Sequence, residues 1–380
     1  MGYLLKDEGK ELVQLAHDFC EKEILPCAAE WDREGTFPKE VLEKAMEIGF
    51  HTLEIPEEYG GSGMDYITVA AVYEEFGKYD LGFATTLMAN TLSLKPVLMH
   101  GTEEQKQRYS ETIVNGGFGA FALTEADAGS DAGATKTIAV KDGDEYIING
   151  SKSYITNSTY ADEFVVFAVT DKEKGLKGIS AFIVEKDREG FSVGKEEDKM
   201  GIRSSDTATI NFDDVRVPAE NLLGEEGKGF IYAMQTLDLA RPLVGATAVG
   251  LAQRSIDEAA KYSLERKAFG KPIAKLQAIG FKLADMEIGA ETARQMVVHS
   301  LQLAEEGLPY TKEAAIAKCY AGDVAFKNAS EAIQILGGYG YSREYPVEKL
   351  LRDAKILQIF EGTNEIQRVI ISGQVINRAK

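Results

Sequence analysis

The stretch LQAIGFKLADMEIGAETARQMVVHSL, residues 276–301, carries apolar side chains at intervals of three and four positions. The stripe consists of Leu276, Ile279, Leu283, Met286, Ala290, Ala293, Val297 and Leu301. This period places the side chains on one face of an α-helix, and its length predicts a long helix buried along one side in a helical bundle. Similar periods predict helices at 246–267, 312–336 and 364–378. We therefore expect a C-terminal helical bundle domain over residues 229–380.

The two preceding parts of the chain have different patterns. Helical periods near 38–49, 66–79 and 103–114 predict an N-terminal helical domain over residues 1–120. Residues 121–228 instead contain short β-rich runs, and Asp142-Gly143 and Asn149-Gly150 are typical turn pairs between strands. We expect a middle domain built as a small antiparallel β-barrel. The fold class is therefore α+β, mainly α.

Composition excludes several classes of function. The chain has 380 residues and a formal net charge of -19, so its mean field repels nucleic acid and anionic lipid. No apolar run approaches the roughly 20 residues of a membrane-spanning helix, and the N-terminal stretch lacks the features of a secretion signal. Cys20, Cys27 and Cys319 are an odd set that suits neither a disulfide framework nor a zinc site. We expect a cytoplasmic protein.

Common metal and nucleotide motifs are missing from the sequence. The four histidines are far apart and none has a metal-binding spacing, so no metal is expected. There is no Gly-x-Gly-x-x-Gly after a strand and no Walker loop, so a nucleotide would not be held in the Rossmann manner. The segment Gly337-Gly-Tyr-Gly340 is more typical of a helix end than of a phosphate-binding loop.

Two segments are candidates for chemistry. In FALTEADAGSDAG, residues 121–133, small residues would let the backbone approach a ligand, although on this segment alone a polar loop entering the barrel is the better explanation. In ILQIFEGTNEIQR, residues 356–368, Glu361 follows an apolar run and precedes a helix start. Apolar walls would raise the pKa of Glu361 and a helix N-terminus would lower it. The residue is either a general base or part of a helix cap.

Taken together, the motifs of this chain resemble those of the acyl-CoA dehydrogenases. They occur in the family's order and span almost the whole chain, and they are most similar to the short- and medium-chain, butyryl-CoA dehydrogenase-like members. The motifs are Phe121-Ala-Leu-Thr-Glu125, Ala128-Gly-Ser-Asp131, Asn149-Gly-x-Lys152, Ile155-Thr-Asn157, Asp238-x-x-Arg241, Arg266-x-x-Phe-Gly-Lys271, Gln334-Ile-x-Gly-Gly338, Arg352-Asp-Ala-Lys355 and Glu361-Gly-Thr-Asn-Glu-Ile-Gln367.

The resemblance implies a helical domain, a β-barrel and a C-terminal four-helix bundle, assembled as a homotetramer (a dimer of dimers) with one FAD per subunit. Thr124 and Thr156 would donate hydrogen bonds to the flavin ring, and Arg266, Gln277 and 334–338 would reach the FAD of a neighbouring subunit. The implied FAD-binding residues are Phe121, Leu123, Thr124, Gly129, Ser130, Tyr154, Ile155, Thr156, Arg266, Phe269, Gln277, Gln334, Ile335, Gly337, Gly338, Thr363, Asn364 and Glu365. The implied substrate-binding residues are Ser130, Asp238, Arg241 and Gly362.

The resemblance also implies the reaction. Glu361 would remove the proton alpha to an acyl-CoA thioester while FAD accepts the beta hydrogen as hydride, which leaves a trans-2-enoyl-CoA. The reverse reduction is equally compatible, and electrons would be exchanged with electron-transferring flavoprotein. Other members place the base where this chain has Ala240. Residues 81–86 lack the Arg that binds dicarboxylic substrates in some relatives. An acyl-CoA oxidase of the same fold and a flavin-free helical scaffold are the alternatives.

Overall fold

The computed structural model describes residues 3–379. The N-terminal part is helical, as predicted, and the helices expected near 38–49, 66–79 and 103–114 are present. Its helices are α1 (Asp7–Phe19), α2 (Ala28–Glu34), α3 (Lys39–Ile48), α4 (Tyr66–Tyr79), α5 (Leu81–His100) and α6 (Glu103–Val114). Asp65 caps α4 by accepting from the Thr68 N–H at 2.8 Å, and Thr102 forms a capping box with Gln105 at the start of α6.

The middle part forms one eight-stranded sheet, and the prediction of a closed barrel is wrong. The strands are β1 (Phe118–Ala122), β2 (Ile138–Asp142), β3 (Glu145–Thr156), β4 (Ala161–Val169), β5 (Ile179–Glu185), β6 (Phe191–Glu196), β7 (Thr207–Pro218) and β8 (Leu222–Leu223). Seven of them follow the order β6-β7-β3-β2-β4-β5-β8, and β1 pairs with β4 off this path, so β6 and β8 are separate ends of the order. The sheet is also mixed, because β4 pairs with both β1 and β2 in parallel.

One of the two predicted turn pairs in this sheet is a turn and the other is not. Gly143 (φ 66°) lies in the tight connection between β2 and β3, which pair as a hairpin. Asn149-Gly150 instead lies inside β3, at a bulge where the register with β7 shifts. A Cβ at Gly150 (φ 142°) would lie 2.7 Å from the Thr137 Cα. A bulge needs the same permissive residue as a turn, so the pair alone does not distinguish them.

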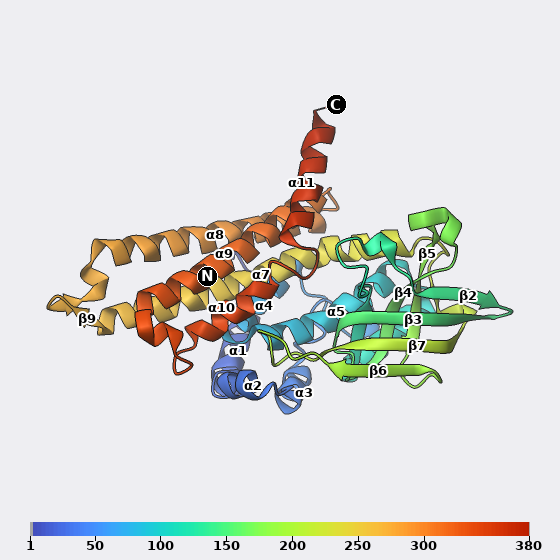
Figure 1. Ribbon diagram of the computed structural model, residues 1–380, viewed down its shortest axis with the longest axis horizontal. Coiled ribbons are helices and arrows are strands. Elements are labelled where there is room, and N and C mark those ends of the chain that lie inside the picture. The colour runs from blue at the N-terminus through green and yellow to red at the C-terminus, as the bar shows by residue number, and fades with distance from the viewer. Residues whose placement is uncertain (1–2, 380) are drawn as a thin grey trace.

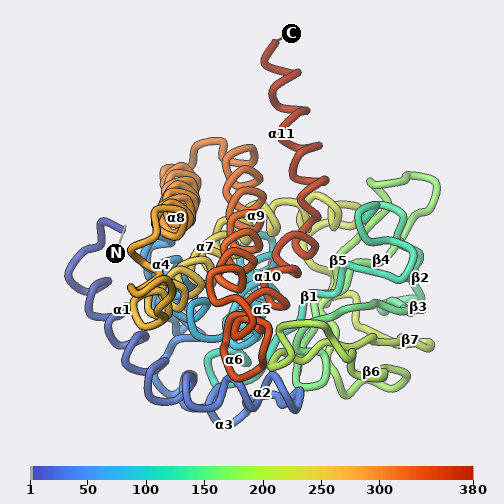
Figure 2. The backbone as a smooth tube through the Cα atoms, turned by 60° about the vertical axis from the view of Figure 1, so that its left-hand side comes forward, coloured from blue at the N-terminus to red at the C-terminus, as the bar shows by residue number. Residues whose placement is uncertain are grey.

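The C-terminal part is helical, as predicted. It contains α7 (Gly229–Glu265), α8 (Gln277–Glu305), α9 (Thr311–Leu336), α10 (Val347–Ile356) and α11 (Asn364–Arg378), with the short strands β9 (Lys267–Ala268) and β10 (Lys271–Pro272) between α7 and α8. Figure 1 shows α7, α8 and α9 running side by side along the molecule, with the sheet at one end and β9 at the other. Both views show α11 leaving the body of the molecule (Figure 2).

Three of these helices match the expected bounds, with α11 spanning the predicted residues 364–378, and one is much longer. α8 and α9 begin and end within a few residues of the predicted positions, and the buried side chains of α8 include Met286 and Leu301. The helix expected from residue 246 instead starts at Gly229 and contains Pro242. None of the helices in residues 3–379 is both long and apolar enough to cross a membrane.

Helix α4 approaches α7 closely through glycine. A Cβ at Gly77 would lie 2.4 Å from the Thr247 carbonyl oxygen, and a Cβ at Gly250 would lie 2.0 Å from the Glu74 carbonyl oxygen. Only a residue without a side chain permits this backbone contact. The N-terminal helices and the C-terminal bundle therefore share one packed core.

A buried charge cluster joins all three parts of the chain. The Lys349 ammonium of α10 lies 2.9 Å from Asp80 Oδ2, before α5, and 2.6 Å from Asp353 Oδ2. The two carboxylates also accept from the middle part: Ser204 Oγ donates to Asp80 at 2.5 Å, and the Ile202 N–H donates to Asp353 at 2.6 Å. Burial opposes the charge on Lys349, but the two carboxylates outweigh it and raise the pKa of Lys349 well above its usual range.

Replacing this lysine tests the junction. Lys349→Met would leave two carboxylates buried without their cation, and we expect the free energy of unfolding to fall by about 3–5 kcal/mol. Urea denaturation followed by circular dichroism measures the loss. Lys39→Met is the control, because Lys39 pairs with Glu43 at 3.8 Å with both side chains more than half exposed, and its loss changes little. Equal urea midpoints for the two variants would contradict a structural role for the junction.

Candidate active site

Glu361 lies in a strained turn between α10 and α11. Its φ is 56° and that of Gly362 is 84°, so two consecutive residues have left-handed backbone. This conformation is uncommon for a residue with a side chain and is concentrated at functional sites. Helix α11 is capped by Thr363, whose Oγ1 accepts from the Ile366 N–H at 3.2 Å. The capping bond therefore comes from Thr363, and Glu361 does not supply it.

The carbonyls of this turn are held from three elements. Gln367 of α11 is fully buried and donates from Nε2 to the Glu361 carbonyl at 3.1 Å and the Gly362 carbonyl at 2.9 Å. Lys318 of α9 donates to the Gly362 carbonyl at 2.8 Å, and Arg241 of α7 donates from Nε to the Glu361 carbonyl at 3.5 Å. These bonds satisfy the carbonyls and leave the Glu361 side chain free.

The Glu361 carboxylate has unused hydrogen-bonding capacity. Its Oε2 atom is buried and has no hydrogen-bond partner among the described residues. Burial raises the pKa of Glu361, and the positive charges of Arg241, Lys318 and Lys95 oppose the rise without cancelling it. The sequence left open whether the pKa of Glu361 is raised or lowered, and in the structure it is raised. A carboxylate with a raised pKa and a free oxygen is suited to accept a proton.

Asp238 and Arg241 form a pair one turn apart on α7. Arg241 is 3% exposed and its Nη1 contacts Asp238 Oδ1. Asp238 Oδ2 accepts from Thr311 Oγ1 at 2.7 Å, and burial raises the pKa of Asp238. The pair lies against the Glu361 turn, because Arg241 also bonds its carbonyl. The buried lysine beside it, Lys318, has its pKa lowered by burial to about 8, with the Glu361 charge opposing the change.

The residues expected at the flavin ring come from two neighbouring segments. Leu123 and Thr124 follow β1, and 154–156 end β3. The Ser153 N–H donates to the Thr124 carbonyl at 2.9 Å, so the two segments lie side by side. Tyr154 has a φ of 58° and is 66% exposed. The structure therefore brings together Phe121, Leu123, Thr124, Tyr154, Ile155 and Thr156, and it leaves Gly129 and Ser130 on an exposed loop.

A buried lysine fixes these two segments to each other. Lys152 Nζ, with no exposed surface, donates to the Leu123 carbonyl at 3.1 Å, Glu125 Oε1 at 2.7 Å and Thr135 Oγ1 at 2.9 Å. Glu125 also accepts from the Thr137 N–H at 3.0 Å. Burial opposes ionisation of Glu125, but Lys152 and these hydrogen bonds lower its pKa to about 2. Burial lowers the pKa of Lys152 to about 8, so the pair is ionised at neutral pH.

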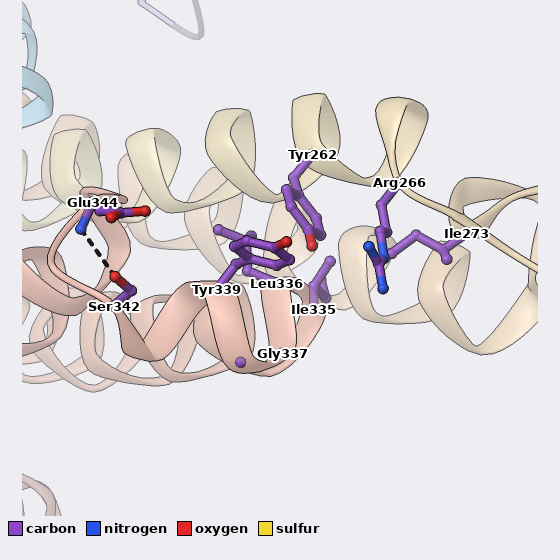
Figure 3. Close-up of a pocket in the computed structure, with 10 residues that line it drawn as sticks. Tyr262, Arg266, Ile273, Ile335, Leu336, Gly337, Tyr339, Ser342 and Glu344 are labelled. Atoms are coloured by element: carbon purple, nitrogen blue, oxygen red, sulfur yellow. Dashed lines mark hydrogen bonds between the residues drawn. The ribbon is translucent and has the colours of Figure 1, made fainter.

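A second group of predicted residues lies at the other end of α7. A surface pocket of about 620 Å³ is lined by four of them, Arg266, Ile335, Gly337 and Gly338 (Figure 3). Two tyrosines and a serine that were not among the predicted site residues also line it. Those residues are Tyr262, Tyr339 and Ser342, and the Arg266 guanidinium lies 5.8 Å from the centre of the Tyr339 ring. The 25 helical positions between Arg241 and Arg266 span roughly 37 Å at 1.5 Å per residue. One chain therefore does not bring this group to Glu361.

The remaining predicted residues are placed as follows. Phe269 is 91% exposed, and Gln277 and Gln334 are also exposed. Asn364 is buried, with Nδ2 donating to the Cys319 carbonyl at 3.1 Å and Asp323 Oδ1 at 2.8 Å, whereas Glu365 is exposed. Asn364 thus helps to hold α11 on α9.

Sequence reasoning missed the roles of three polar residues at this site. Gln367 and Lys152 stand in the family motifs, but the motifs do not indicate what these side chains bond. Lys318 stands in none of the motifs. A lysine in an alanine-rich helical stretch is normally solvated, and the only available signal was that Lys318 falls on the buried face of α9.

Comparison with known proteins gives a consistent family assignment. Three family models match in order: acyl-CoA dehydrogenase, N-terminal domain (residues 6–117), middle domain (residues 120–215) and C-terminal domain (residues 227–376). The short-chain specific acyl-CoA dehydrogenase of Megasphaera elsdenii is 48% identical over 99% of this chain and 100% of its own length.

Two solved structures are equally similar in fold. Butyryl-CoA dehydrogenase from Megasphaera elsdenii superimposes with a TM-score of 0.96 and 48% identity, covering 99% of this chain and 100% of that one. A chain of a structure described as the electron transferring flavoprotein of Acidaminococcus fermentans has a TM-score of 0.96 and 47% identity, covering 99% of both chains. This chain belongs to the acyl-CoA dehydrogenase family.

Proposed function

We propose that this chain is an FAD-dependent dehydrogenase of short acyl-CoA thioesters, which forms trans-2-enoyl-CoA or runs the reverse reduction. The observation that carries the proposal is the buried Glu361 carboxylate, which has a raised pKa and an unpartnered Oε2. The relatives named above, a short-chain specific enzyme and a butyryl-CoA dehydrogenase, support the substrate class. The earlier base position, Ala240, has no acidic side chain and is 1% exposed.

The chain's own residues would handle the proton. FAD, when bound, supplies the acceptor for the beta hydrogen. Glu361 Oε2 would take the alpha proton, and the Glu361 N–H would donate to the thioester oxygen as negative charge develops there. Arg241, Lys318 and Gln367 would keep the turn in its left-handed conformation, because they bond its two carbonyls. Asp238 and Arg241 would bind the CoA moiety, with Ser130 and Gly362 beside it.

The residues near β1 and β3 fit a flavin ring. Thr124 and Thr156 are half-buried hydroxyl residues on adjacent segments. Tyr154, two residues before Thr156, is exposed. Gly129 has no neighbour within 4 Å of an added Cβ, so its backbone is open to a ligand. Thr363, Asn364 and Glu365 would complete the nucleotide site at the start of α11.

The second group of predicted residues supports a site shared between subunits. Arg266 lies roughly 37 Å from Arg241 along α7, and Gly337 and Gly338 line the same pocket as Arg266. We assign these residues, together with Gln334 at the end of α9, to the FAD of a neighbouring copy. Phe269 and Gln277 are exposed on the segment that follows α7, and Ile335 lines the same pocket as Arg266. A homotetramer built as a dimer of dimers would use each end of α7 for a different FAD.

Partners and organisation follow from the same proposal. Electron-transferring flavoprotein would exchange electrons with the flavin, and the Acidaminococcus fermentans structure supports this choice. We propose domain boundaries at 1–120, 121–228 and 229–380, with a four-helix bundle in the last. Three unpaired cysteines, Cys20, Cys27 and Cys319, support a cytoplasmic location.

Glu361→Gln tests the base. It keeps the shape of the side chain but cannot accept the proton, so we expect FAD content and acyl-CoA binding to be retained and flavin reduction to slow at least about a hundredfold. Anaerobic stopped-flow bleaching with butyryl-CoA measures the rate. Glu111→Gln in α6, an exposed carboxylate, is the control and should bleach like wild type. Bleaching of Glu361→Gln at the wild-type rate would show that another residue is the base.

The pH dependence of the same reaction tests the raised pKa. Only the ionised carboxylate can act as the base. We therefore expect kcat/KM to have its full value above the pKa of Glu361 and to fall as the pH drops through that pKa. Because burial raises that pKa, the fall should begin above the reference value of about 4.3. In Arg241→Met, removal of a nearby positive charge should move the fall to higher pH. A shift to lower pH would contradict the electrostatic account.

FAD occupancy tests the shared site. Arg266→Ala removes a residue that we assign to the neighbouring copy's FAD, so the ratio of flavin to protein absorbance of the purified enzyme should drop. Lys261→Ala, an exposed change one turn earlier on α7, should leave the ratio unchanged. Size-exclusion chromatography with light scattering gives the assembly state. A monomer that retains one FAD per chain would overturn the shared site.

A further inference from the structure

A buried asparagine directly follows the residues expected at the flavin ring. Asn157 comes after Thr156, has no exposed surface and has a φ of 65°. Asparagine adopts this left-handed backbone more often than most residues with a side chain, and glycine adopts it most readily. The turn between β3 and β4 accounts for the backbone of Asn157, because its carbonyl accepts from the Tyr160 and Ala161 N–H groups at 2.9 and 2.7 Å. It does not account for the side chain.

The amide of Asn157 reaches beyond its own turn to two other elements. Its Nδ2 atom donates to the Thr86 carbonyl at 3.1 Å and to Asn90 Oδ1 at 3.0 Å, both on α5. The same atom donates to the Gly119 carbonyl of β1 at 3.4 Å. Thr86 and Asn90 are four residues apart and therefore lie on the same face of α5. One side chain thus joins the end of β3 to both α5 and β1.

Asn90 completes this contact from the side of α5. It is fully buried, and the Oδ1 atom that accepts from Asn157 also accepts from the Gly119 N–H at 3.2 Å. The strand lies close to the helix here, since a Cβ at Gly119 would lie 2.1 Å from Ser93 Oγ. The two asparagines therefore bond both backbone groups of Gly119, two residues before Phe121, the first of the residues expected at the flavin ring.

The two asparagines are incompletely satisfied, which argues against a role in stability alone. Asn157 Oδ1 and Asn90 Nδ2 are buried and have no hydrogen-bond partner among the described residues. Leaving a buried polar group unpaired is unfavourable, and an apolar pair of similar shape would avoid this loss. Hydrogen bonds are directional, however, and a buried polar contact can specify one arrangement of the groups that it joins. The contact is therefore better suited to fixing position than to adding stability.

We propose that Asn157, held by Asn90, is a positioning residue that fixes the Thr156 hydroxyl relative to residues 121–124 for binding of the FAD ring. The inference rests on the proposed function, in which Thr156 is a hydroxyl residue at that ring, and it adds a residue that acts through Thr156. Gly119 leads into one of the two segments and Asn157 follows the other, so the contact between them sets how the segments face each other.

A double-mutant cycle on FAD affinity tests this inference. Asn157→Gly keeps the left-handed backbone and removes the amide, and Thr156→Val removes the hydroxyl at nearly constant shape. Serial dilution of the purified holoenzyme, followed by the fluorescence of released flavin, gives each dissociation constant. We expect Asn157→Gly to raise this constant about tenfold or more, and to have clearly less effect when Thr156→Val is already present, because the hydroxyl that it positions is then absent. Both single changes should shift the visible absorption of the bound flavin in the same direction.

Asn328→Ala is the matched control. Asn328 of α9 is 1% exposed and donates from Nδ2 to the Met286 carbonyl at 3.0 Å, so the change removes a buried amide at the contact between α8 and α9. It should leave the FAD dissociation constant and the flavin absorption unchanged. If Asn157→Gly cannot be purified in folded form, Asn90→Ala takes its place in the cycle, because Asn157 then loses one acceptor and keeps its two carbonyl acceptors.

The outcomes separate the inference from the proposed function. An unchanged dissociation constant in Asn157→Gly, equal effects of this change with and without Thr156→Val, or the same weakening by Asn328→Ala would each overturn the positioning role. Flavin bleaching of the wild-type enzyme by butyryl-CoA would still support the dehydrogenase in those cases. If the wild-type protein retains no FAD, the proposed function fails as well.

Discussion

The buried contact of Lys349 with Asp80 and Asp353 is the interaction on which the candidate site depends. The site takes its residues from the segments around β1 and β3, from α7 and α9, and from the turn at Glu361, and these belong to three different parts of the chain. Lys349 and Asp353 are on α10, which ends at Ile356, five residues before Glu361. Holding α10 against Asp80, Ile202 and Ser204 therefore also sets where Glu361 is presented.

The strained turn then determines what Glu361 can do. Left-handed backbone is unfavourable at Glu361, whereas Gly362 adopts it readily. The turn persists because Arg241, Lys318 and Gln367 bond the carbonyls that it exposes. The same two cations lie near the carboxylate, yet burial outweighs them and the pKa rises. Arg241 and Lys318 therefore hold the turn with charged groups, and the pKa of Glu361 still stays above its usual value. Backbone position and proton affinity are set by one group of contacts.

Local periodicity predicted much of the fold. It could not predict whether the sheet closes into a barrel, or which residues far apart in the sequence are in contact. The stripe from Leu276 to Leu301 gives α8 because helix period depends only on neighbours. The barrel was wrong because closure depends on which edge strands meet, and β6 and β8 remain apart. The start of α7 was missed because Pro242 normally interrupts a helix. The apolar flank of Glu361 made it a candidate, and the family resemblance implied its role as the base. Lys318 and Lys95 carry no pattern that separates them from surface lysines.

The exposed apolar side chains of the chain bear on why the site has two distant parts. Phe269 is 91% exposed, and Val369 and Ile376 of the projecting helix α11 are 64% and 58% exposed (Figure 2). Side chains of this kind are typical of surfaces that another protein covers. Phe269 follows the pocket residue Arg266 by three positions, and α11 begins directly after the Glu361 turn. Each part of the proposed FAD site therefore borders a surface suited to association, which is the arrangement expected if two copies complete one site.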